Sequence, residues 1–281
     1  MTDNPHNTKG YAPLEGPYDI GVGYGLITLV EPHPGHELAY NRWYEQDHFF
    51  SGALMQPYLF SGRRWVATRD LQLLRYSDEA GATVLDPITR GCYLGTYWIV
   101  PDRIDDHMLF TRAANNRCAE DGRKFTERTL VFSEFQEWAT SIYRSESVPR
   151  DIFALINPCP GLVLEVVDAP EPEGRDSLEK WLVEEHLPSR LRAPESPAEL
   201  AMVFRTNPPR KHASHVAKDC SNGGRRLTIL WFLTRDPREN WSSFFGPEGA
   251  LVAAGGAGRL SLIAPFIPAK MGSDLYVDQL R

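Results

Sequence analysis

Stretches of apolar and β-branched residues alternate along the chain with longer segments whose apolar positions recur at helical spacing. Residues 36–54 form the longest helical pattern of the first half, since they hold no Gly or Pro before Gly52. A polar excursion covers residues 68–90, and a short helix is expected to end at Tyr143. The predicted order is β-α-β-β-α-β, with strands at 24–30, 58–67, 92–100 and 129–135 and helices at 36–54 and 103–120.

The second half repeats this order. Its patterns predict strands at 162–167, 200–205, 226–234 and 260–267, and helices at 177–192 and 236–245. An Asp-Pro pair opens the second of these helices, with Asp236 as the expected cap and Pro237 at the first helical position. We therefore divide the chain into a polar arm (1–21), a first repeat (22–143), a linker (144–160), a second repeat (161–269) and a tail expected to be an exposed arm (270–281).

A local motif supports an internal duplication. Trp43 is followed by Asp47 and His48, and Trp181, 138 residues later, is followed by Glu185 and His186 at the same spacing. In both halves a strand containing a tryptophan (Trp98, Trp231) also precedes an Asp/Pro pair. Repeats at this level indicate two copies of one supersecondary unit.

The β-α-β-β-α-β unit is the ferredoxin-like plait, an antiparallel sheet with both helices on one face. Its other sheet face is apolar and has to be covered. We therefore predict an α+β fold in which two ferredoxin-like repeats pack sheet to sheet within one chain, as an intramolecular dimeric α/β barrel.

Composition narrows the class of protein. The net charge of −7 argues against a nucleic-acid partner, because phosphate binding needs a basic face. The chain has no apolar run long enough for a membrane span, and its first twenty residues do not resemble a secretory signal. Four widely spaced cysteines fit reduced thiols, so we expect a cytoplasmic location. A high aromatic content of 11% suits either core packing or an aromatic ligand.

Residues 40–48 (YNRWYEQDH), followed by Pro57 and a strand with Arg63 and Arg64, resemble the signature of dimeric α/β-barrel proteins. The second copy, with Leu187-Pro188 after His186, is similar to the EthD-like and polyketide-cyclase-like branches. The first copy departs from that pattern, because Phe49-Phe50 replace the Leu-Pro step. The resemblance implies a cleft between helices and sheet, and a family of cyclases, isomerases, cofactor-free monooxygenases and haem enzymes.

Three residues of the first helix, Tyr40, Tyr44 and His48, lie four apart and share one stripe, with Trp43 and Asp47 on an adjacent one. A histidine near a carboxylate is suited to proton transfer at neutral pH. Asp47 is adjacent in sequence, however, and points about 100° away from His48, so Tyr44 is the better placed partner. The alternative is that His48 has only a structural role, with its ring hydrogen-bonded at the end of the helix near Pro57.

The Arg63-Arg64 pair lies in a strand, so one side chain points to each face of the sheet. An inward arginine could bind a carboxylate or phenolate or stabilise an enolate; an ion pair with Asp47 or Glu45 is the alternative. The candidate catalytic residues are therefore His48, Tyr44, Arg64, Tyr40, Asp47 and His186. Candidate pocket walls are Trp43, Tyr58, Trp65, Tyr93, Tyr97 and Trp98, although alternation alone does not assign their faces.

The histidines also raise the questions of a metal site and of a haem site. The pairs His33/His36 and His212/His215 lack helical spacing and a carboxylate partner, so no metal site is expected. A haem would need an axial histidine facing the cleft, for which His186 is the candidate. The glycines at 255, 256 and 258 follow a helix rather than a strand, so we expect a turn and no phosphate loop.

Our functional hypothesis is an enzyme without a cofactor that acts on a hydrophobic aromatic or polycyclic small molecule by His-mediated proton transfer, as a cyclase, isomerase or lyase. The alternatives are a small-molecule carrier without catalysis and an oxidative enzyme that uses haem or oxygen. The expected partner is the small molecule alone, and a homodimer is compatible with the pattern. Fold by itself does not select among these functions.

Overall fold

The computed structural model describes residues 20–78, 84–207, 220–256 and 258–281. Most of the predicted N-terminal arm and the pair His212/His215 lie outside these ranges. Within them, no helix is both long and apolar enough to cross a bilayer.

The first repeat follows the predicted order of strands and helices. A π-helix, η1, continues α1, so the predicted helix at 36–54 has two hydrogen-bonding patterns. The elements are β1 (Tyr24–Pro32), α1 (Glu37–Trp43), η1 (Tyr44–Leu54), β2 (Leu59–Val66), α2 (Arg69–Leu73), β3 (Tyr93–Ile99), α3 (Ile104–Glu120) and β4 (Arg128–Tyr143).

The second repeat has the same sequence of elements, with its helices broken into shorter pieces. After the short helix η2 (Asp151–Phe153) come β5 (Gly161–Asp168), η3 (Pro172–Gly174), α4 (Arg175–Trp181), η4 (Leu182–His186), α5 (Leu187–Arg192), β6 (Ala198–Arg205), β7 (Arg226–Leu233), η5 (Pro237–Glu239), η6 (Trp241–Phe245), α6 (Glu248–Gly256), β8 (Arg259–Pro268) and η7 (Val277–Gln279).

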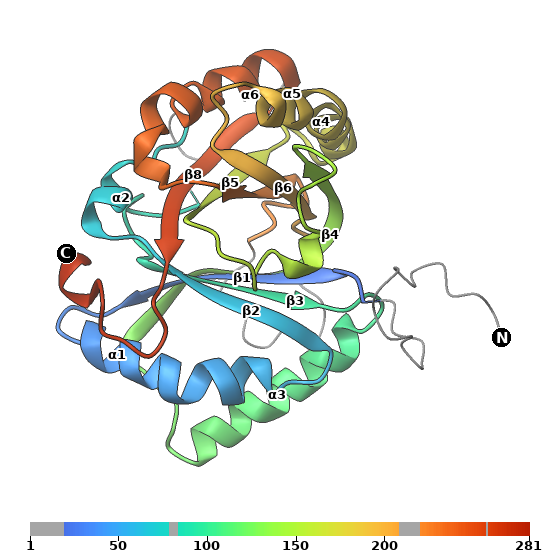
Figure 1. The fold of residues 1–281 in the computed structure, drawn as a ribbon. Helices are drawn as coiled ribbons and strands as arrows, with labels where there is room; N and C mark the ends of the chain where they lie inside the picture. The colour runs from blue at the N-terminus through green and yellow to red at the C-terminus, as the bar shows by residue number, and fades with distance from the viewer. Residues whose placement is uncertain (1–19, 79–83, 208–219, 257) are drawn as a thin grey trace.

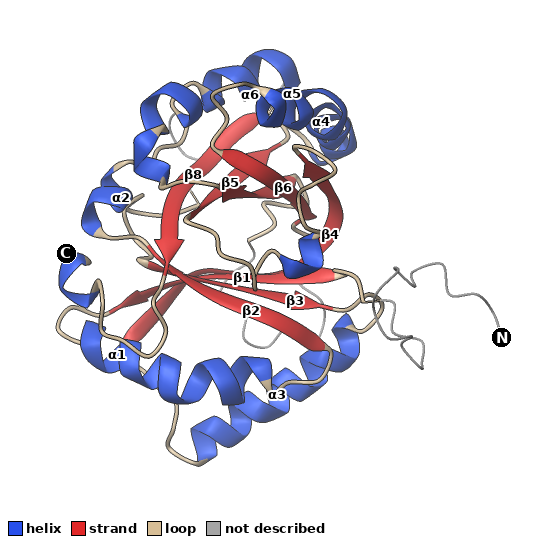
Figure 2. Cartoon of the chain, viewed as in Figure 1, coloured by secondary structure: helices blue, strands red, loops and turns tan. Residues whose placement is uncertain are grey.

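The strands close into one antiparallel barrel in the order β1-β3-β2-β8-β5-β7-β6-β4. Each repeat supplies four adjacent strands in the ferredoxin-like order, and the helices lie outside, with α1 and α3 against the first repeat and α4, α5 and α6 against the second (Figures 1 and 2). The predicted α+β class and the intramolecular barrel of two ferredoxin-like repeats are confirmed.

Two seams join the repeats, and they differ in length. At one seam β4 pairs with β6 over six residue pairs, from Glu137↔Arg205 to Tyr143↔Leu200. At the other seam β2 pairs with β8 only at Trp65↔Pro268 and Val66↔Ile267. Beyond these two pairs, β8 is paired in part by the chain after α2, because Tyr76 forms a β-bridge with Ile263 of β8.

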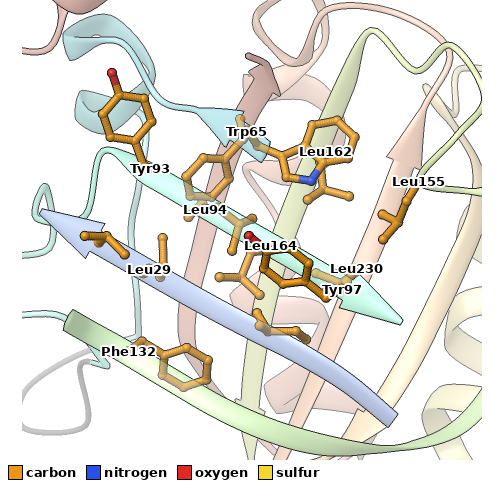
Figure 3. Close-up of a cluster of buried hydrophobic side chains, with 14 of the residues drawn as sticks. Leu29, Trp65, Tyr93, Leu94, Tyr97, Phe132, Leu155, Leu162, Leu164 and Leu230 are labelled. Carbon is orange, nitrogen blue, oxygen red and sulfur yellow. The ribbon is translucent and has the colours of Figure 1, made fainter. Parts of the chain in front are cut away.

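Side-chain alternation divides each strand between the barrel interior and the helix layer. In β3, Leu94 and Trp98 point into the barrel, whereas Tyr93 and Tyr97 face the helices, as the pairing with β1 requires. Trp65 shares the interior face with Leu94. The interior is filled by apolar side chains from both repeats, among them Leu29, Phe132, Leu162, Leu164 and Leu230 (Figure 3).

Two expectations about chain ends differ from the structure. The segment up to Tyr143 extends β4 and forms no helix, because β6 hydrogen-bonds to it. The tail is exposed over most of its length, as expected, but it is not a free arm: its Asp274 carboxylate pairs with Arg42 (2.7 Å), and Leu280 is 1% exposed. Both differences concern contacts with residues distant in sequence, which local patterns do not report.

Candidate functional site

The repeated Trp/His motif has the same geometry in both repeats. The rings of Trp43 and His48 stack with centroids 4.6 Å apart and an 18° angle between planes, and Trp181 and His186 stack at 4.6 Å and 26°. Both histidines lie in π-helical segments, η1 and η4. A π-helix bonds residue i to i+5, which brings residues five apart onto one face and explains the stack. Such segments are frequent at functional sites.

Arg64 is buried between β2 and the helix of the first repeat, with 1% of its surface exposed. Its Nη1 donates to Asn41 Oδ1 (2.6 Å) and to Glu45 Oε1 (3.1 Å). The guanidinium carbon lies 3.9 Å from the ring centre of Tyr93 and 4.5 Å from that of Tyr44. The ion pair with Glu45, the alternative considered from sequence, is therefore present, and aromatic faces cover the cation.

Tyr44 and Tyr97 join this cluster through their hydroxyl groups, which hydrogen-bond to each other. Burial raises the pKa of Tyr44, and burial raises the pKa of Tyr97 well above its usual range, with the Tyr44 hydroxyl adding to the effect. Burial also raises the pKa of Tyr40 and of Tyr93. All these phenols are therefore protonated at neutral pH and can donate a hydrogen bond to an anionic oxygen.

His48 lies beside this cluster and is half-buried. Its ring is 5.5 Å from that of Tyr44, and among the described residues neither ring nitrogen has a hydrogen-bond partner. Burial lowers the pKa of His48 to about 3, and the positive charge of Arg128 acts in the same direction. The imidazole is therefore neutral at physiological pH, and in this setting it is a weaker base than a free imidazole.

Asp47 takes no part in this arrangement. Its carboxylate accepts from Arg123 Nε (2.9 Å) and from the Ser51 hydroxyl (2.6 Å), on the outside of the helix. The Arg123 guanidinium lowers the pKa of Asp47, so that carboxylate remains ionised. Its role is to tie η1 to the chain after α3.

The structure also separates the expected pocket walls. Trp43, Tyr93 and Tyr97 belong to the cluster, but Trp65 and Trp98 point into the barrel, where both are fully buried. Tyr58 lies on the surface with 37% exposure. Asn41, which also holds Arg64, was missed, although its spacing of four from Glu45 on one helix is a signal that could have found it.

His186 belongs to a different cluster, in the second repeat. Its Nε2 hydrogen-bonds to Glu248 Oε1, and Arg190 Nε donates to the other oxygen of Glu248 (3.2 Å). Glu165 lies nearby on β5 and accepts from Trp231 Nε1 (2.7 Å). Both glutamates are 0% exposed. Neither was predicted as a site residue, since they are 83 residues apart in sequence.

The glycines at the end of α6 belong to this second cluster as packing positions. Gly255 and Gly256 lie in α6, where we expected a turn. A Cβ at either position would come within 2.2 or 2.4 Å of the Trp181 indole. The helix therefore approaches the Trp181/His186 stack through glycine alone.

Replacing Glu165 by Gln should make stability less sensitive to alkaline pH. Burial raises the pKa of Glu165 well above its usual range, and Glu248 adds repulsion. Stability from the protonated acid is thus complete below the unfolded pKa and is lost as pH rises through the folded pKa. Gln keeps the neutral form, so its advantage grows with pH, by about 1.4 kcal/mol per unit of pKa difference. Urea unfolding at pH 5 to 9 measures this, and parallel curves for both proteins would contradict it.

Two surface hollows lie away from both clusters. One, of about 310 Å³, lies at the end of β5 and is lined by both polar and apolar residues, including Asp168, Arg225 and Ala253. The other, of about 270 Å³, lies between the end of β1, α2 and Arg281. The Arg64 cluster is packed closed, and His48, which is partly exposed, lies beside it.

Comparison with known proteins identifies the fold. No family model matches the chain, and no curated protein does. Among solved structures, a candidate chlorite dismutase superposes with a TM-score of 0.53 at 12% identity, covering 93% of this chain and 100% of that one. An encapsulated DyP-type peroxidase from Mycobacterium smegmatis superposes with a TM-score of 0.50 at 11% identity, covering 96% and 99%. At such identities the likeness shows the dimeric α/β-barrel fold alone.

Haem is a group that this fold family implies, so we tested whether the residues of the second repeat fit it. The candidate axial ligand His186 binds Glu248 through Nε2 and is stacked against Trp181. The space between helices and sheet is occupied by fully buried side chains of one core cluster, including Leu182, Trp231, Phe244 and Phe245. These residues do not fit a haem in this arrangement.

Proposed function

We propose that the chain is a cofactor-independent enzyme that transfers a proton on a small aromatic substrate, with its site in the first repeat. The observation that supports this most is the buried Arg64 beside the hydrogen-bonded hydroxyls of Tyr44 and Tyr97. A cation and protonated phenols held in an apolar setting stabilise negative charge that develops on a substrate oxygen. The neutral imidazole of His48 lies next to them.

Each residue then has a distinct role. His48 accepts the proton from a carbon next to a carbonyl or from a phenol, as a general base. Tyr44 and Tyr97 act as a hydrogen-bonded pair, in which one hydroxyl donates to the resulting oxyanion and the other donates to that hydroxyl, and Arg64 supplies the positive charge. The depressed pKa of His48 keeps it unprotonated, and the anion formed beside it stabilises the imidazolium that results.

This assignment belongs to the cyclase, isomerase or lyase type of our functional hypothesis. A carrier protein with the same pocket would bind the aromatic molecule but would leave its protons in place. A proton-exchange measurement therefore separates the enzyme from the carrier.

His48→Gln should slow proton abstraction at least about 100-fold, the usual contribution of a positioned general base. The reaction to follow is exchange of the α-hydrogens of aryl ketones such as 2-tetralone in D₂O, by NMR. Gln has a similar size and no basic nitrogen, so the fold should persist. The exposed His33→Gln variant serves as the matched control and should exchange at the wild-type rate. Equal exchange by wild type and His48→Gln, or none above the buffer rate, would remove the assignment.

A further inference from the structure

Several arginines of this protein bind a carboxylate with one particular edge of the guanidinium group. Arg226 uses Nε and Nη2 on the two oxygens of Asp168 (2.8 Å each). Arg205 uses the same two nitrogens on Glu179 (2.7 and 2.6 Å). This side-on edge places two parallel N–H groups at the spacing of a carboxylate.

Arg64 differs from them. It binds Asn41 and Glu45 through Nη1 alone, and within the described residues its Nε and Nη2 have no hydrogen-bond acceptor although both are buried. Buried donors are normally satisfied, and an exception calls for an explanation. Two buried hydroxyls of the same cluster, on Tyr40 and Tyr93, also have no partner among the described residues.

We propose that the Nε/Nη2 edge of Arg64 binds the carboxylate of a small aromatic acid, which defines the substrate class of the proposed site. A planar pair of oxygens matches the edge, and the tyrosine hydroxyls supply further donors. The rings of Tyr44 and Tyr93, which already lie against the guanidinium, would also contact the aromatic body of a bound acid. This inference rests on the proposed function only because it places the acid at the same site.

The charges around Arg64 permit a second carboxylate. Glu45 already pairs with Nη1 of Arg64. Its other oxygen accepts from the backbone N–H of Gly272 (2.7 Å), so the negative charge of Glu45 is shared between these two donors. A second cation, Arg128, lies 4.5 Å over the ring of Trp43. Arg64 and Arg128 both act on Tyr40 and Tyr44, and this positive character suits the single charge of a carboxylate.

Binding should be measured with 2-naphthoate as the probe, by calorimetry and by near-UV circular dichroism. Because Arg64 is buried, a ligand has to shift the surrounding tyrosine rings, which the dichroism reports. The neutral isostere 2-naphthamide should bind at least about tenfold more weakly, since the amide lacks the charge that strengthens a bidentate pair. Inorganic phosphate should not compete. Equal affinity for acid and amide, or no binding of the acid, would overturn the proposal.

Arg64→Lys keeps the charge but loses the side-on edge, and it should weaken naphthoate binding at least about tenfold. Arg63→Lys is the matched control: Arg63 lies on the opposite sheet face and donates to the Asn157 carbonyl, so binding should be unchanged. If Arg64→Lys does not fold, Tyr93→Phe replaces it, with a loss of roughly threefold to tenfold expected for one hydroxyl. Wild-type affinity in the folded Arg64 or Tyr93 variant would refute the edge as the binding site.

The two proposals can fail separately. Naphthoate binding without any α-proton exchange would disprove the enzyme and keep the acid site. Exchange without a preference for the acid would keep the enzyme and disprove the acid site.

Discussion

Arg64→Met should destabilise the protein by about 3–5 kcal/mol, the usual cost of removing one partner from a buried ion pair. The substitution leaves the Glu45 carboxylate, only 8% exposed, with the Gly272 N–H as a remaining partner. It also removes a cation from three tyrosine faces, since Tyr40 lies 5.5 Å from the guanidinium as well. Urea unfolding followed by far-UV circular dichroism measures the loss.

A double variant separates charge from packing in this result. Adding Glu45→Gln to Arg64→Met should restore part of the lost stability, because the stranded charge is gone. Arg63→Met on the opposite face should cost less, since no carboxylate pairs with Arg63 in the described chain. A loss below about 1 kcal/mol for Arg64→Met would show that the buried ion pair is not part of the folded state.

Trp98→Ala should cost about 3–5 kcal/mol, as expected for deleting a large aromatic side chain from a packed core. Trp98 is 0% exposed inside the barrel, where it stacks on Phe204 with ring centres 5.5 Å apart. It therefore holds strands of the two repeats together. Naphthoate binding should change little in the folded variant, because Trp98 faces away from the Arg64 cluster.

The exposed Leu38→Ala is a suitable control for Trp98→Ala and should alter stability by less than about 0.5 kcal/mol. If Trp98→Ala were nearly neutral for stability and instead abolished ligand binding, Trp98 would be a pocket wall, as the sequence analysis allowed. The stability and the naphthoate affinity of Trp98→Ala together show whether Trp98 is a core residue or a pocket wall.

Sequence patterns were sufficient for the architecture because the hydrophobic periods of strands and helices are local properties. The repeated Trp/His spacing also corresponds to a shared local structure, because the Trp and His rings stack in both repeats. Local patterns do not assign the two faces of a strand, because in β3 both faces are apolar or aromatic. Tyr97 and Trp98 are neighbours in sequence, yet one faces the helices and the other the barrel, and only the strand register assigns them.

The site residues show the same limit. Tyr40, Tyr44, His48 and Arg64 were predicted together and lie together, because three of them share a helix whose spacing is visible in the sequence. The pairing of His186 with Glu248 joins segments 62 residues apart, and nothing local marks Glu248 as its partner. Burial decides the charge state of Glu165, and burial is a property of the assembled fold.

The unequal seams give this barrel a preferred place to come apart. Six residue pairs hold β4 to β6, but two hold β2 to β8. We therefore expect local opening to begin at the shorter seam, where few backbone bonds must break together. Arg64 lies in β2 next to that seam, and its carbonyl accepts from the backbone N–H of Ala269 (3.1 Å), so opening there would reach the aromatic cluster first.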